Sequence, residues 1–329
     1  MKNHFFRMSV SLLLIGLFSP RCLSFQQWPR NYPVYDHILI VIEENKYYDE
    51  IIGSKNAPYM NTLRTEGANL TKMFAEEHHS EGNYFWLFSG SNQHVGFADV
   101  IPNSINNQDY PFKAHNLGEQ LIEKGYSFRG FSEGLPATGS SVERDKPLLY
   151  ARKHVPWISF ANLPNGTNAD SSVNLQFNQF PSDYSKLPRV CFVIPNLIDD
   201  MHDGPSRESV RTGDRWLQEK LDAYYQWAKS NNSLLIVTFD ENEDSTNITG
   251  LTDPADTERD RQNRIPTIIA GAHIIPGDYA EGKGITHVNI LRTLEAMYGL
   301  ERCGAQQSFA AKYGISDESI LTDIFAPSR

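Results

Sequence analysis

Short apolar runs of strand length alternate along the chain with segments compatible with helices. The apolar runs predict strands over residues 37–43, 126–131, 190–194, 234–239 and 266–270. Helices are predicted over residues 58–66, 84–90, 115–124, 213–229 and 286–298. The last two of these helices show apolar residues three and four positions apart, which is the helical period. Regular alternation of strands and helices is typical of an α/β protein built in layers.

Two long segments lack both patterns. Residues 161–186 are rich in Asn, Ser, Pro and Gly, and residues 242–264 are polar with almost no apolar content. Stretches of this length inside a domain are commonly lids or binding loops, and otherwise mobile insertions. Because no repeat or linker divides the chain, we expect a single domain over residues 25–329 that carries these two segments as polar loop insertions.

The first 24 residues have the pattern of a secretory signal peptide. Lys2 and Arg7 precede an apolar run at residues 10–18, and the small residue Ser24 follows at a plausible cleavage point. The run is too short to span a bilayer stably, and no later segment reaches 18 unbroken apolar residues. We therefore expect a secreted protein, extracellular or periplasmic, without stable membrane insertion. An uncleaved N-terminal anchor is the alternative.

Composition and charge narrow the possible partners. With 329 residues, 40% of them hydrophobic and 21% charged, the chain can bury a full core. It carries 30 Lys and Arg against 40 Asp and Glu, a net charge of −10, which becomes about −13 once the signal and its three basic residues are removed. Such a surface repels nucleic acid and anionic membranes in general, so we expect no nucleic-acid partner. An anionic substrate would need a metal ion or local cations.

Cysteines and sequons leave several questions open. Outside the signal, Cys191 and Cys303 could form one disulfide or remain two buried thiols. The chain has four Asn-x-Ser/Thr sequons, which are Asn69, Asn165, Asn231 and Asn247. They would be glycosylated only in a eukaryotic secretory route. The sequence does not define the oligomeric state.

Oxygen-bearing side chains follow directly after two of the predicted strands. Glu44 and Asn45 follow the first strand, and Asp240 and Glu241 follow the fourth. Open α/β sheets bind ligands at the carboxyl ends of their strands. Carboxylate and amide oxygens suit Mg²⁺, Ca²⁺ or Mn²⁺, whereas Zn²⁺ prefers more nitrogen. The pattern predicts one divalent metal site assembled from these residues.

A serine and a histidine in polar loops are candidates for catalysis. Ser80 precedes the helix-compatible run 85–88, and its hydroxyl could attack phosphorus if a metal ion lowered its pKa. Asn83, three residues on, could help the helix N-terminus to stabilise oxyanions. A simple helix N-cap is the alternative for Ser80. His202 lies among acids after the third strand and could bind a metal or hold a proton, although a solvated turn explains the acids equally well.

Potential cations elsewhere could attract phosphate. Lys153 and His154 lie beside Arg152 and aromatic residues, where they form a local source of positive charge or an ordinary basic surface patch. His287 opens the last long helix, where it could face a site or merely cap the helix.

Six short motifs occur in the order seen in the secreted phosphoesterase family, and the chain resembles that family over residues 36–300. The motifs are Glu44-Asn45, His-x-Ser-x-x-Asn-Tyr at 78–84, Arg-Lys-His at 152–154, Ile-Pro-Asn at 194–196 with Asp-Met-His-Asp at 200–203, Thr-Phe-Asp-Glu at 238–241, and Ile-Pro-Thr at 265–267 with Gly271. The family includes bacterial acid phosphatases and phosphatidylcholine-type phospholipases C and belongs to the alkaline-phosphatase-like superfamily.

The resemblance implies a fold and a metal site. The fold is a three-layer alkaline-phosphatase-like one with a central, mostly parallel sheet flanked by helices. The metal ligands would be Glu44, Asn45, Asp240 and Glu241. Ser80 would be a metal-bound nucleophile that forms a phosphoserine intermediate.

The resemblance also implies residues that contact phosphate. Asn83 would bind a phosphoryl oxygen, and His154 and His287 resemble histidines that surround the phosphate, with Lys153 beside them. His202 or a neighbour could protonate the leaving group. In relatives with two metal ions, Asp and His side chains at positions like Asp199, Asp200, His202 and His287 bind the second ion, but we expect one ion here.

The chain departs from the family pattern at two positions and lacks the motifs of several other protein classes. The family usually has proline where this chain has His79 and Gly82, so Ser89 and Ser91 are alternative nucleophiles. The chain has no Gly-x-Ser-x-Gly, P-loop, His-Glu-x-x-His or sulfatase motif. We expect a secreted, metal-dependent phosphatase that acts on phosphorylated small molecules. A phospholipase C or other phosphodiesterase acting on a phospholipid head group, and an inactive binding relative, are the alternatives.

Overall fold

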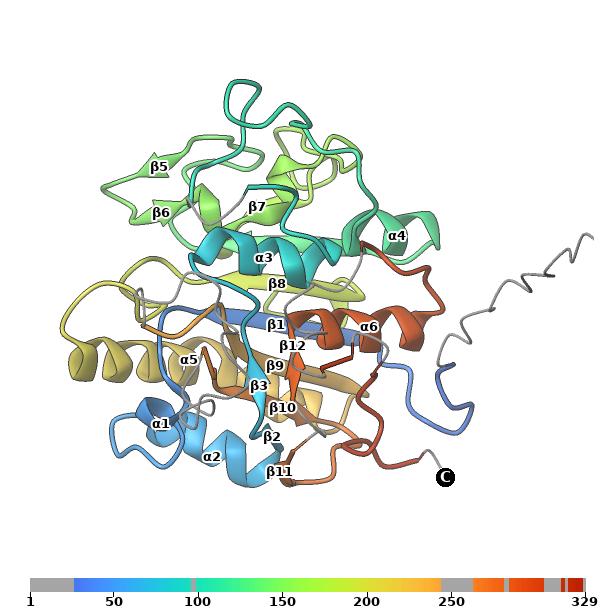
Figure 1. The fold of residues 1–329 in the computed structure, drawn as a ribbon. Coiled ribbons are helices and arrows are strands. Elements are labelled where there is room, and N and C mark those ends of the chain that lie inside the picture. Colours follow the sequence, from blue (N-terminus) through green and yellow to red (C-terminus); the bar gives the residue numbers. More distant parts are fainter. Residues whose placement is uncertain are drawn as a thin grey trace, which may run out of the picture.

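A computed structural model describes residues 27–95, 99–243, 263–280, 284–304, 315–316 and 319–327, and an eight-stranded sheet runs through its centre (Figure 1). The strand order is β11-β2-β10-β9-β1-β8-β4-β7. The strands are β1 His37–Glu43, β2 Ala68–Leu70, β4 Phe128–Ser132, β7 Asn174–Gln176, β8 Val190–Ile194, β9 Ser233–Phe239, β10 Thr267–Gly271 and β11 Gly277–Tyr279. Neighbouring strands are parallel except for β10, which is antiparallel to both β9 and β2.

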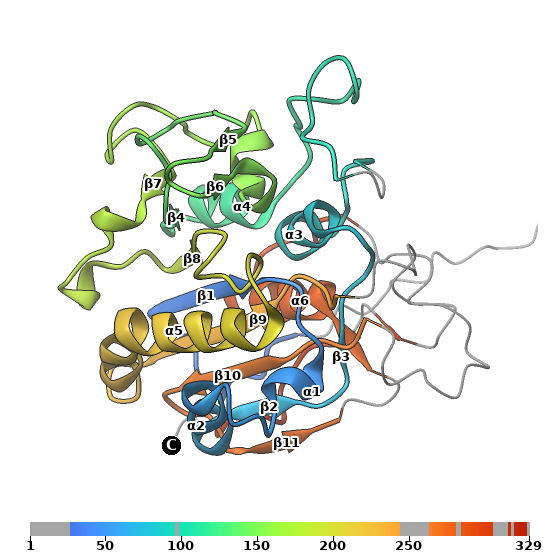
Figure 2. The ribbon, with the colours of Figure 1, turned by 90° about the vertical axis from the view of Figure 1, so that its left-hand side faces the viewer.

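Helices cover both faces of this sheet. They are α1 Tyr48–Ile51, α2 Pro58–Glu66, α3 Ser80–Ser89, α4 Leu117–Glu123, α5 Ser206–Ala228 and α6 His287–Tyr298. Helices α2 and α5 contact each other on one face, and α3, α4 and α6 contact one another on the other face (Figure 2). The predicted α/β fold with a mostly parallel sheet flanked by helices is confirmed.

The central strands are apolar at nearly every position because helices cover both of their faces. In β1, every residue from Ile38 to Ile42 is at most 2% exposed. In β9, Ser233 and Thr238 are the polar positions, and both are buried with hydrogen-bonded hydroxyls. Most polar residues therefore lie at or beyond the ends of these two strands.

Short elements connect the main ones. Two-residue strands pair as β3 Met73–Phe74 with β12 Ile285–Thr286 and as β5 Arg144–Asp145 with β6 Tyr150–Ala151. Short 3₁₀ helices are η1 Arg152–His154, η2 Pro156–Ser159, η3 Phe177–Gln179 and η4 Tyr184–Lys186.

Some predicted boundaries were wrong. Helix α3 begins four residues earlier than predicted, and α5 begins seven residues earlier. Polar first turns gave no apolar periodicity at either place. Residues 161–186 are not a structureless loop, because they contain β7, η3 and η4, and β7 pairs with β4 at the sheet edge. Most of the other polar insertion, and the predicted signal, lie outside the described residues.

Several open points of the sequence have structural answers. Cys191 and Cys303 are separate buried thiols. The sequon residue Asn69 is fully buried, Asn165 and Asn231 are exposed, and Asn247 lies outside the described residues. Within the described parts of the chain, no helix combines the length and apolar character needed to cross a bilayer.

Candidate active site

The carboxyl ends of β1, β8 and β9 bring acidic residues from distant parts of the chain together. The Asn45 backbone N–H donates to Asp240 Oδ1 at 3.0 Å, and the Glu44 backbone N–H donates to the Asp200 carbonyl at 2.7 Å. Because β1 lies between its parallel neighbours β8 and β9, the residues that follow these three strands emerge at one edge. The structure thus brings the predicted metal ligands to a common place.

Asn45 occupies a turn that suits its side chain. Its φ is 54°, a left-handed conformation that asparagine tolerates better than most residues. This turn directs the Asn45 N–H at Asp240, while the side chain lines a cavity next to Glu241.

Ser80 lies between two of the acids. Its Oγ is 3.0 Å from Glu241 Oε1 and 3.2 Å from Glu44 Oε2 and can donate to either. His79, not Ser80, holds the N-cap position of α3, so the simple N-cap alternative for Ser80 is wrong. The alternative nucleophile Ser89 lies at the other end of α3 and donates to the Phe85 carbonyl.

The loop before Ser80 contains consecutive charged residues that are buried and bonded to different elements. Glu77 accepts from Asn92, and His78 Nδ1 is bonded to Glu241 Oε2. The Asn83 side chain accepts from the backbone N–H groups of Glu76 and Glu77 at 3.0 and 3.1 Å and donates to the Glu77 carbonyl at 2.7 Å. At 1% exposure, Asn83 organises this loop, and its geometry does not support the predicted phosphate contact.

Both ring nitrogens of His287 are also hydrogen-bonded within the protein. Its Nδ1 is 2.7 Å from Glu76 Oε2 and its Nε2 is 2.8 Å from the Phe239 carbonyl, so both nitrogens donate when the ring is charged. Burial opposes that charge, but Glu76 and the carbonyl outweigh it and raise the pKa of His287. Glu76 also accepts from the Val288 N–H at the start of α6. This position ties α6 to the loop before Ser80 and does not support the predicted phosphate contact of His287.

Replacing His287 with glutamine should remove a pH-dependent part of the stability. Because the folded-state pKa is raised, the pair contributes fully below about pH 6.5, the ordinary histidine value, and is lost as pH rises through the folded-state pKa. Breaking a buried pair costs about 3–5 kcal/mol. Urea unfolding of both proteins should give the largest difference in acid and a smaller one in alkali. The exposed His115→Gln is the control, and a difference independent of pH would contradict the assignment.

His154 lies beside Glu44 rather than in an open cavity. Its Nε2 is 3.2 Å from Glu44 Oε1, its Nδ1 is 3.7 Å from Asp200 Oδ2, and its ring stacks on Tyr84 with centroids 5.1 Å apart. The Tyr84 hydroxyl donates to Glu44 Oε1. Among the described residues, Glu44, His154 and Asp200 form a group whose ligand atoms all lie within 4.8 Å of one another. The predicted ligand set for a single metal ion did not include Asp200, which the resemblance placed only among ligands of a second ion, and no role was predicted for Tyr84.

Negative charge accumulates at this edge. Burial raises the pKa of four carboxyl groups, which are those of Asp240, Glu44, Asp200 and Glu241. Repulsion from Asp240 raises the pKa of the last three further. The nearby Lys153 pairs with Asp99; burial opposes its charge, but Glu44 and Asp99 leave the pKa of Lys153 above its usual value. Asp200 Oδ2 and Asp240 Oδ2 are buried and accept no hydrogen bond from the described residues. Buried carboxylate oxygens that lack a hydrogen bond suit a divalent cation.

A cavity of about 320 Å³ opens beside these acids. Its lining residues are Asn45, His78, His79, His202, Glu241, Asn242 and Glu243. His202 is 28% exposed there, with its Nδ1 2.8 Å from Asp203 Oδ1. The predicted leaving-group residue therefore lines a cavity that adjoins Glu241 and, through it, Ser80.

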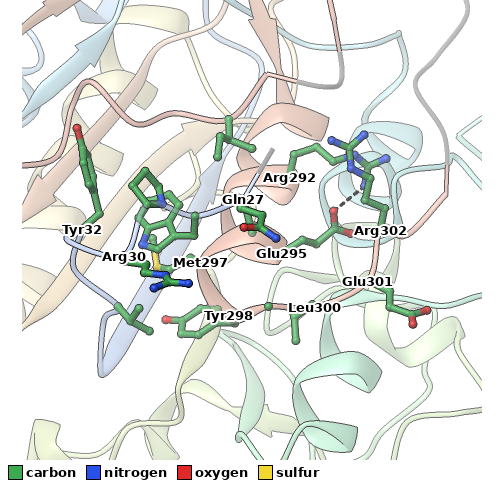
Figure 3. A pocket seen from close by; sticks show the side chains of 16 residues that line it. Gln27, Arg30, Tyr32, Arg292, Glu295, Met297, Tyr298, Leu300, Glu301 and Arg302 are labelled. Carbon is green, nitrogen blue, oxygen red and sulfur yellow. Dashed lines mark hydrogen bonds and ion pairs between the residues drawn. The ribbon is translucent and has the colours of Figure 1, made fainter. Parts of the chain in front are cut away.

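A larger cavity, of about 950 Å³, lies at the other end of α6 (Figure 3). The figure shows Met297, Tyr298 and Leu300 on its wall and the ion pair of Arg292 with Glu295. Because α6 rises about 1.5 Å per residue, this wall lies roughly 16 Å from His287. None of the predicted site residues lines it.

Comparisons with known proteins place the chain in a family. The Phosphoesterase family model matches residues 54–301. The chain is 43% identical over 275 residues to a phosphatidylinositol-3-phosphatase of Mycobacterium tuberculosis, with 83% of this chain and 80% of that protein covered. It is 27% identical over 280 residues to a probable acid phosphatase of Kluyveromyces lactis, with 82% of this chain and 60% of that protein covered.

Two solved structures share the fold. A protein of the alkaline phosphatase superfamily from Vibrio parahaemolyticus has a TM-score of 0.55 at 13% identity, with 82% of this chain and 68% of that chain covered. The lipoteichoic acid synthase LtaP from Listeria monocytogenes has a TM-score of 0.53 at 14% identity, with 87% and 78% covered. The predicted alkaline-phosphatase-like fold is thus confirmed. The chain belongs to the Phosphoesterase family and is a hydrolase that acts on phosphoric esters.

Proposed function

We propose that this protein is a secreted, metal-dependent phosphomonoesterase that works through a phosphoserine at Ser80. The observation that carries the proposal is the position of Ser80 Oγ, within 3.2 Å of both Glu44 and Glu241 where the strands end. Secretion rests on the pattern of residues 1–24. The name of the mycobacterial relative makes the phosphorylated inositol of a lipid one monoester substrate to test.

One divalent cation would be held by Glu44, Asn45, Asp240 and Glu241. The group of Glu44 with His154 and Asp200 is the alternative ligand set, and Glu44 is common to both. The bound cation supplies a lower pKa for the serine hydroxyl and charge stabilisation for the phosphoryl oxygens.

The side chains of the chain account for the proton transfers. Ser80 Oγ attacks phosphorus while Glu241 Oε1 or Glu44 Oε2 accepts its proton, and the bond from phosphorus to the leaving oxygen breaks. His202, in the cavity wall, gives a proton to the departing alcohol. Water then attacks the phosphoserine while His202 takes a proton from that water. The bond from phosphorus to Ser80 Oγ breaks, the carboxyl group that took the serine proton returns it to Oγ, and inorganic phosphate leaves.

Removing metal should stop turnover of phosphomonoesters. Purified protein would be assayed on p-nitrophenyl phosphate, bis-p-nitrophenyl phosphate, phosphatidylcholine and phosphatidylinositol 3-phosphate, before and after treatment with a chelator. We expect monoester cleavage that the chelator abolishes and that one of Mg²⁺, Mn²⁺, Ca²⁺ or Zn²⁺ restores. Full activity in protein shown to be metal-free by mass spectrometry would contradict metal dependence. Cleavage of the diester or of phosphatidylcholine alone would indicate a phosphodiesterase, and no cleavage at all would indicate a binding protein.

A further inference from the structure

Most charged and imidazole groups that line the cavity beside Glu241 already have a hydrogen-bond or ion-pair partner. Glu241 is bonded to Ser80 and His78, and Glu243 pairs with the buried Lys46. His202 pairs with Asp203 outside the cavity lining. A phosphate ester entering here meets two carboxylates and few donors that are free to bind it.

His79 differs from the other charged and imidazole side chains of this wall. It lines the same cavity and directly precedes Ser80. Its backbone is extended, with φ −100° and ψ −173°, and its side chain does not cap α3. The ring is only partly buried and makes no hydrogen bond, ion pair or ring contact with any residue that the structure describes.

We propose that His79 is a substrate-contacting residue that binds the phosphate ester through its ring N–H and so sets substrate affinity. This inference rests on the proposed function and deepens it. An imidazole carries at least one N–H donor in either protonation state, so the contact does not depend on titration. Among the described residues, no hydrogen bond or ion pair joins the ring to Ser80, Glu44 or Glu241, so its loss should leave the attacking geometry intact.

The test compares His79→Ala with His79→Gln, which keeps an N–H donor. For His79→Ala we expect KM for p-nitrophenyl phosphate and the Kd of inorganic phosphate, measured by calorimetry on metal-loaded protein, to rise roughly tenfold. The value of kcat should stay within about twofold of wild type, and His79→Gln should recover part of the affinity. The exposed His115→Ala is the matched control and should change neither quantity.

Two results would overturn the assignment. One is a phosphate Kd within about twofold of wild type in His79→Ala, and the other is a fall in kcat at unchanged KM. The phosphate titration needs no turnover, so it decides the role of His79 even if the Ser80 mechanism fails. Conversely, a Ser80→Ala protein that remains active would refute the mechanism and leave the His79 result standing.

Discussion

Ser80→Ala should lose phosphatase turnover by about 10⁴-fold or more, because the attacking oxygen itself is removed. The fold should remain, since Ser80 Oγ donates to carboxyl groups, among them those of Glu44 and Glu241, and caps no helix. Steady-state assays on p-nitrophenyl phosphate measure the loss, and thermal unfolding checks the fold. Acid quenching of wild type during turnover should yield a phosphorylated peptide that contains Ser80.

Ser89→Ala is the matched control on the same helix. In wild type, Ser89 Oγ donates to the Phe85 carbonyl at the far end of α3 from Ser80, so the variant should keep wild-type kcat. If the Ser80 variant retained turnover, or if the trapped phosphate were found elsewhere, the nucleophile would have to be another residue.

Glu44→Gln should lower turnover by about 10²–10³-fold and weaken cation binding. The Glu44 carboxylate is shared by Ser80 Oγ, the Tyr84 hydroxyl and His154 Nε2, and it belongs to both candidate ligand sets. Glutamine keeps the shape but loses the charge. Burial, and then repulsion from Asp240, raise the pKa of Glu44, which means that its charged form is disfavoured in the folded protein. In chelator, the melting temperature of the neutral variant should therefore be no lower than that of wild type.

Calorimetric titration with Mn²⁺ and melting curves with and without chelator measure these effects. Added Mn²⁺ should raise the melting temperature of wild type more than that of the variant. Glu143→Gln, at an exposed acid, is the control. Asp200→Asn and Asp240→Asn then show which neighbour shares the ion with Glu44. Unchanged Mn²⁺ affinity in Glu44→Gln would exclude both ligand sets.

The sequence alone was sufficient to place the central strands and the acids that follow them. Strands β1 and β9 are buried on both faces, so their ends lie close to a change from apolar to polar residues, at Glu43, the last residue of β1, and at Asp240, directly after β9. Parallel neighbours then bring those ends together. Strand β7 was not predicted, because its three residues at the sheet edge carry only one apolar side chain.

The roles of individual polar side chains were harder to predict. Asn83 and His287 do lie near the site, but their hydrogen bonds go to the loop before Ser80 and to the Phe239 carbonyl. Those partners depend on tertiary packing between α3, α6 and β9, which no local pattern encodes. One signal was visible: Glu76, Glu77 and His78 are consecutive charged residues beside apolar strands and helices, as expected of groups that are buried in pairs.

The packing of Glu77 against Gly82 restricts how this enzyme can be altered. A methyl group at position 82 would lie 1.6 Å from Glu77 Oε1, so a larger residue there requires the Glu77 carboxylate, which accepts from Asn92, to move. Libraries that aim to broaden substrate range should therefore vary these two positions jointly or hold both constant.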